Sequence, residues 1–159
     1  AYCNARYEGV GGGEEPSGTM DIAQIAFEDL AAYDARYFPV PRERFLRYWL
    51  TQPDAVIRAV VRGAKIEGYG MLRPCQVGYK FGPLFAETPG VGETLFGALA
   101  AHAPGAPIFL DVPEPNTAAV ALAERHGMTK VFATARMYNR EAPPLPLGGI
   151  FGVTSFELG

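Results

Sequence analysis

The spacing of hydrophobic and polar residues changes twice along the chain. In the first third, apolar residues recur at helical spacing and predict one helix at about residues 25–37 and a second within residues 39–50. In the second segment, Pro41 suits a first-turn position, and the apolar positions from Phe45 to Leu50 fall on one face. Pro53 then ends the helical pattern.

The middle of the chain has the pattern of β-structure. The segment AVIRAVVRG, residues 55–63, is rich in β-branched residues, and IEGYGMLRP, residues 66–74, follows it after a short turn. We therefore expect these two strands to form a hairpin. A third strand is expected at GYKFGPLFA, residues 78–86.

Helices and strands alternate in the last part of the chain. Residues 89–103 predict a helix, residues 106–113 a short buried strand, residues 130–138 an alternating strand and residues 149–158 a last strand. Between them lies LDVPEPNTAAVALAERHGM, in which Asn116 suits a helix N-cap and Gly127 a left-handed helix end. The order of elements predicts an α/β fold, in which helices flank both faces of a mixed β-sheet of about six or seven strands.

The N-terminal segment has a different character. Residues 1–7 look like a strand, and GVGGGEEPSG, residues 9–18, is typical of a flexible linker. Those glycines lack the Lys-Ser/Thr pair that follows them in a phosphate-binding loop. We therefore divide the chain into a strand with its linker at 1–18 and a domain at 19–159, and expect the strand to pair outside that domain's core or with another copy.

Composition narrows the range of functions. The chain of 159 residues has a net charge of −3, which gives no basic field for nucleic acid. It has no apolar run near the ~20 residues of a membrane span. Its two cysteines are too few for a disulfide scaffold or a cysteine metal site, so we expect no metal, and we expect a cytoplasmic location.

Two motifs carry a family resemblance. ETPGVG, residues 87–92, stands between a strand and a helix, and the Asn116 helix follows the next strand. This arrangement resembles the GNAT superfamily of N-acetyltransferases. The segments RPC, GPLFA and FLDVPEPN resemble more closely the second half of tandem GNAT-like bacterial proteins. On that resemblance, residues 1–7 would be the last strand of a preceding acetyltransferase domain.

The resemblance implies an acetyl-CoA site. In the family, the fourth and fifth strands splay apart, and the pantetheine arm pairs with the exposed edge of the fourth strand, while backbone N–H groups at a helix start hold the pyrophosphate. The positions so implied are Leu84, Phe85 and Ala86 for the arm, Gly90, Val91 and Gly92 for the phosphates, and Asn116 and Ala119 beside the thiol.

The site also departs from the family pattern. Glu87 stands where the family has Gln or Arg, and Ala123 stands where many members have the Tyr that protonates the leaving thiolate. Acyl transfer to an amine needs a base and an acid. We take Asp111 as candidate base and Tyr138 as candidate acid, although each could instead make a structural hydrogen bond.

Two functions remain open from the sequence. The first is acetyl-CoA-dependent N-acyl transfer to an unknown, small amine, with acyl-chain size left open. The alternative is a catalytically degenerate GNAT-like domain that serves as structural or regulatory partner of another acetyltransferase domain. The partner would be an upstream GNAT domain or a second copy in a homodimer.

Overall fold

A mixed sheet of eight strands runs through residues 1–158, the part of the chain that the computed structural model describes. The strand order is β2-β3-β4-β5-β6-β1-β7, and β8 pairs with β5 off this path. The predicted α/β class is confirmed. The strands are β1 (Tyr2–Val10), β2 (Met20–Asp21), β3 (Val56–Arg62), β4 (Lys65–Pro74), β5 (Tyr79–Ala86), β6 (Pro107–Pro113), β7 (Thr129–Arg136) and β8 (Ile150–Gly152).

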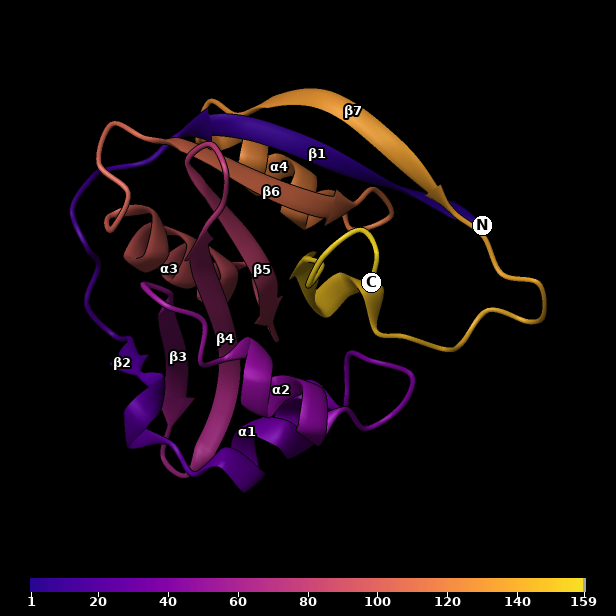
Figure 1. Ribbon diagram of the computed structural model, residues 1–159, viewed down its shortest axis with the longest axis horizontal. Helices are drawn as coiled ribbons and strands as arrows, with labels where there is room; N and C mark the ends of the chain where they lie inside the picture. The colour runs from indigo at the N-terminus through magenta and orange to yellow at the C-terminus, as the bar shows by residue number, and fades with distance from the viewer. Residues whose placement is uncertain (159) are drawn as a thin grey trace.

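Helices cover both faces of the sheet, as predicted (Figure 1). The helices are α1 (Phe27–Asp34), α2 (Glu43–Trp49), α3 (Pro89–Ala100) and α4 (Thr117–Arg125), with short 3-10 turns at Ile22–Gln24 and Leu147–Gly149. One apolar cluster joins α1 to the sheet through Leu30, Tyr69 and Phe85. A second joins α3 and α4 to the opposite face through Leu95 and Leu122. In residues 1–158, no helix is both long and apolar enough to cross a membrane.

The central hairpin follows the prediction. β3 and β4 are antiparallel, and Arg62 faces Lys65 across a turn that contains Gly63. Gly63 has a φ of 62°, in the left-handed region that glycine adopts without steric cost. The second helix begins later than predicted, because Arg42 is the N-cap of α2 and Pro41 lies before the first turn.

β5 and β6 are parallel neighbours, and they are the two strands for which the resemblance implies splaying. They are in register only at Tyr79↔Ile108 and Lys80↔Phe109. Beyond those residues the two strands no longer pair with each other, so the sheet opens toward the C-terminal ends of both. The expectation that these strands splay apart is confirmed.

The predicted place of the N-terminal strand is wrong. β1 lies inside the sheet, antiparallel to β6 on one side and to β7 on the other, and Ala5 is completely buried. The segment alternates between the two faces of the sheet, so that Ala5 and Tyr7 join the α3 and α4 core. It therefore belongs to the same sheet as residues 19–158; whether it ends a preceding domain in a longer chain stays a prediction.

Candidate functional site

Three elements meet where β5 and β6 separate. The C-terminal end of β5 carries Leu84, Phe85 and Ala86, α3 begins at Pro89 beside it, and α4 begins at Thr117 after β6. α3 packs on β5, and α4 packs on β6 and on α3. The end of β5 and the start of α4 thus border the opening between β5 and β6, which we call the groove. Gly90 and Val91 lie elsewhere, because they line a cavity of about 390 Å³ with Val60, Val61 and Arg62 of β3.

The groove is filled by the chain's own C-terminal segment. β8 pairs antiparallel with β5 at Leu84↔Gly152 and Phe85↔Ile150. On the other side, Val153 N donates a hydrogen bond of 2.9 Å to the carbonyl oxygen of Asp111 in β6. Figure 1 shows this segment between the diverging strands. β8 therefore supplies the edge pairing that the pantetheine arm of a cofactor would need.

Asn116 connects the start of α4 to this segment. Its Oδ1 accepts a hydrogen bond from Ala119 N at 3.2 Å, which confirms the predicted N-cap. Its Nδ2 donates to the carbonyl oxygens of Ile150 at 2.9 Å and Gly148 at 3.2 Å. Both polar atoms of this side chain thus make hydrogen bonds within the protein, at the position where the resemblance implies a cofactor thiol.

Phe151 explains one of the glycines of α3. Its side chain is completely buried. A Cβ on Gly92 would lie 3.0 Å from two carbons of its ring, whereas a Cβ on Gly90 would approach nothing closer than Thr88 Oγ1 at 3.9 Å. The backbone approach that requires glycine at position 92 is made by an aromatic ring of the same chain.

The residues around the groove do not fit an acyl-CoA arm in this arrangement. Leu84, Ala86 and Ala119 have no exposed surface, Phe85 is 2% exposed, and Asn116 is 4% exposed. Interiors are packed to the density of organic crystals, so a pantetheine arm could enter only if β8 left.

Glu87 lies beside the start of α3 in an exposed ion-pair cluster. Its carboxylate is 2.7 Å from Arg36 Nη1 and 3.1 Å from Lys65 Nζ. The hydrogen bond from Arg36, supported by Lys65, lowers the pKa of Glu87 below its ordinary value. The charge that departs from the family pattern is therefore offset by two cations of this chain.

Asp111 is completely buried and doubly paired. Arg6 in β1 donates from Nε and Nη2 to its two carboxylate oxygens at 2.7 and 2.8 Å, and Lys80 Nζ lies 2.7 Å from Oδ2. The antiparallel register places Arg6 directly opposite Asp111. Both oxygens are thus occupied by cations, an arrangement typical of a structural carboxylate.

A second buried carboxylate was not foreseen from the sequence. Asp34 in α1 accepts two hydrogen bonds from Arg42, at 2.7 and 2.9 Å, and one from Tyr69. Burial first, and then the Asp34 charge, raise the pKa of Tyr69. Arg42 Nη2 also donates to Thr154 Oγ1 at 2.9 Å, so this cluster ties the C-terminal segment to α1 and α2. The sequence signal that could have revealed this cluster was a charged residue, Asp34, on the buried face of the first helix.

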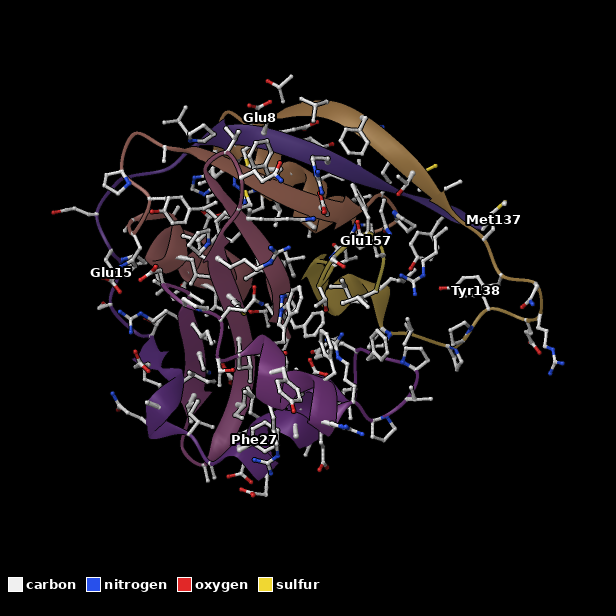
Figure 2. The ribbon with its side chains drawn as sticks, viewed as in Figure 1. Glu8, Glu15, Phe27, Met137, Tyr138 and Glu157 are labelled. Carbon is white, nitrogen blue, oxygen red and sulfur yellow. The ribbon has the colours of Figure 1, made fainter. Side chains whose placement is uncertain are left out.

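Tyr138 lies away from the groove. It follows the outer end of β7, where its hydroxyl accepts a hydrogen bond from Arg136 Nε at 2.8 Å. Burial, reinforced by a hydrogen bond with Tyr138, raises the pKa of neighbouring Tyr2 to about 12. Tyr138, labelled in Figure 2, lines a separate cavity of about 310 Å³, which we call the outer hollow. Its lining includes Asn4, Thr134, Arg136, Tyr138, Phe156 and Glu157. None of the predicted cofactor-binding residues is among the described residues that line it.

Comparison with known proteins agrees with this architecture. The model of a GNAT acetyltransferase domain matches residues 30–152. Holothin acyltransferase from Pseudoalteromonas sp. (strain SANK 73390) is 25% identical over 147 residues, which cover 92% of this chain and 50% of that protein.

Solved structures share the fold. A protein from Pyrococcus horikoshii that was assigned to the acetyltransferases superposes with a TM-score of 0.82 at 21% identity, over 100% of this chain and 52% of that one. A GCN5-related N-acetyltransferase from Sphaerobacter thermophilus gives a TM-score of 0.55 at 13% identity, over 84% and 50% of the two chains. The chain thus spans about half the length of these relatives. Because the family model covers most of the sequence and the fold agrees with it, the chain belongs to the GNAT family of acetyltransferases.

Proposed function

We propose that this chain is the GNAT domain of an acyltransferase that contributes structure rather than acyl-CoA binding, and that acyl-CoA binds to a partner domain. One observation carries the proposal: β8 occupies the opening between β5 and β6, where it pairs with β5, and Val153, the next residue, donates a hydrogen bond to β6. A cofactor arm would compete with a covalently attached strand for the same hydrogen bonds.

The free energy of burial supports the same conclusion. Ile150, Phe151 and Val153 are 4%, 0% and 3% exposed. Fully burying such a side chain contributes about 1.5–3 kcal/mol. Displacing the segment would expose all three and would also break its links to Asn116 and Arg42. An acyl-CoA molecule would have to offset that loss before it could bind.

The edge strand supports the presence of a partner. All of β7 but Arg136 is exposed, and Val131 and Phe132 leave 46% and 45% of their surfaces accessible. Apolar side chains on an uncovered sheet edge are the kind of surface that another chain or domain covers. The relatives are about twice as long as this chain, which leaves room for such a domain in them.

The second candidate is acetyl-CoA-dependent N-acyl transfer to a small amine by this domain itself. The parallel, splayed β5 and β6 and the sequence Gly90-Val91-Gly92 at the start of α3 favour it. It requires β8 to leave the groove. Asp111 would also have to release Arg6 or Lys80 before it could accept a proton.

Calorimetric titration with acetyl-CoA separates the two candidates. We expect no saturable heat, and no thiol release when the chain is mixed with acetyl-CoA and a panel of small amines. Saturable one-to-one binding that Gly92→Asp weakens, while the exposed control Thr129→Asp does not, would overturn the proposal. Turnover that Tyr138→Phe reduces would assign the acid role to Tyr138, and increased turnover in Ala123→Tyr would support the second candidate.

A further inference from the structure

We propose that the outer hollow binds a small zwitterion of the α-amino acid class with an apolar side chain. Figure 2 shows Tyr138 beyond the end of β7 and Glu157 on the C-terminal segment, on the same side of the molecule. A cavity of about 310 Å³ is at the small end of the range for ligand pockets, which suits a molecule of amino-acid size.

Two opposite charges line the hollow without pairing. Within residues 1–158, Arg136 forms no salt bridge. Its Nε donates a hydrogen bond to the Tyr138 hydroxyl, and its guanidinium lies 5.6 Å from the centroid of the Tyr138 ring. Glu157 also has no salt bridge with any described residue. Hydrogen bonds from its own backbone N–H and from Ser155 lower the pKa of Glu157, so its carboxylate is charged at neutral pH. The charges of Lys80 and Arg6, which are paired with Asp111, also lower this pKa. The hollow therefore offers a ligand the Arg136 cation and the Glu157 anion, neither of which has a salt bridge in residues 1–158.

Asn4 adds a buried acceptor to these charges. Its residue is 3% exposed, and its Oδ1 has no hydrogen-bond partner in the described part of the chain. A buried polar group without a partner costs about 1–3 kcal/mol. Asn4 lines the hollow directly opposite Thr134 in β7. A donor on a bound ligand would supply the missing hydrogen bond.

These groups select the chemistry of the ligand. An ammonium group would donate to Asn4 Oδ1 and pair with Glu157, and a carboxylate would pair with Arg136. A simple anion would meet the Glu157 carboxylate, and a simple amine would leave Arg136 unpaired. Phe156 and Met137 give the lining its apolar part, against which an apolar side chain can pack.

This inference is independent of the proposed function. The predicted cofactor-binding residues do not line the hollow, so the inference does not rest on the proposed function. A failed test of one leaves the other standing.

The test uses three related probes. L-phenylalanine carries both charges, phenethylamine lacks the carboxylate, and 3-phenylpropanoate lacks the ammonium. In calorimetric titrations of the whole chain, we expect L-phenylalanine to bind at least about tenfold more tightly than either single-charge probe. Glu157→Gln and Arg136→Gln should each weaken its binding about tenfold or more. The exposed controls Glu8→Gln and Arg44→Gln should leave it unchanged.

The opposite results are equally clear. Absence of L-phenylalanine binding by the folded wild-type chain would overturn the proposal. So would equal affinity for L-phenylalanine and 3-phenylpropanoate, which would indicate a plain anion site. Unchanged binding in both Glu157→Gln and Arg136→Gln would place the ligand elsewhere and overturn it as well. Glu157 is exposed and Arg136 only partly buried, so both variants are expected to fold.

Discussion

The groove and the outer hollow differ in how their polar groups are satisfied. In the groove, Asn116 and the edge of β5 make their hydrogen bonds to the C-terminal segment. In the hollow, Asn4 Oδ1 has no partner and Arg136 and Glu157 have no salt bridge in residues 1–158. The family resemblance indicates where a ligand could bind, and the unsatisfied groups indicate where this chain still has a place for one.

Asp111 has a link to each of these two regions. Its carbonyl oxygen accepts the hydrogen bond from Val153 at the groove. Its carboxylate holds Arg6, whose guanidinium lies 4.6 Å from the ring centroid of Phe156, a residue of the hollow. We therefore expect removal of the Asp111 charge to lower the free energy of unfolding more than any other substitution considered below.

Asp111→Asn should lower the free energy of unfolding by about 3–5 kcal/mol, because it leaves Arg6 and Lys80 partly buried without their counter-charge. Denaturant unfolding monitored by circular dichroism measures it. The exposed Asp29→Asn, in the first turn of α1, is the matched control and should change stability by about 1 kcal/mol or less. If Asp111→Asn lowered stability as little as Asp29→Asn, the ion pairs of Asp111 with Arg6 and Lys80 would not contribute to the stability of the fold.

Asn116→Ala should have the next largest effect. It removes the cap of α4, worth about 1 kcal/mol, and two hydrogen bonds to the C-terminal segment, worth about 1 kcal/mol each. Thr88→Ala removes the corresponding cap of α3 without touching the segment. The difference between the two losses measures how firmly the segment holds the groove, and equal losses would contradict the contrast between the two regions.

Much of the fold could be predicted because its signals are local. The β3–β4 hairpin, the cap at Asn116 and the left-handed Gly127 follow from residues near each other in sequence. The position of β1 could not be predicted in that way. Its partners are residues 107–113 and 129–136, and nothing in its own nine residues distinguishes a central strand from one that pairs with another domain.

The site shows the same division. Of the residues that the resemblance implies, Leu84, Phe85 and Ala86 in β5 and Asn116 and Ala119 at the start of α4 lie beside the groove, whereas Gly90 and Val91 line a cavity beside β3. The resemblance could not show that residues 150–152 fill the groove. A three-residue strand is too short for its sequence pattern to indicate which strand it pairs with. The ion pair between Asp111 and Arg6 depends on the register of β1 against β6. The sequence analysis had placed β1 outside the domain, so this pair could not be predicted.

The two glycines at the start of α3 test how tightly Phe151 fills the groove. Gly92→Ala should lower stability by about 1–3 kcal/mol relative to Gly90→Ala, since the new methyl group presses on the buried Phe151 ring. Gly90→Ala meets open space and should be neutral or stabilising by up to about 1 kcal/mol. Thermal unfolding of the pair measures the difference. Equal stabilities would mean that the ring moves easily and that the groove is only loosely filled.

The smallest expected effect concerns the charge at the edge of the groove. Arg36 and Lys65 lower the pKa of Glu87 below its ordinary value of 4.5. A carboxyl group that is more acidic in the folded state stabilises the fold above the unfolded pKa, and that contribution is lost as the pH falls through the folded value. Because the cluster is near the surface, it is worth at most about 1 kcal/mol. Glu87→Gln should therefore be slightly less stable than wild type at neutral pH, with a difference that is smaller at about pH 3 and that shrinks as salt is added. Thermal unfolding at both pH values measures it. A difference that persists at low pH would show that Glu87 acts through packing rather than charge. Packing would then stabilise the edge of the groove, as the buried Phe151 side chain stabilises its interior.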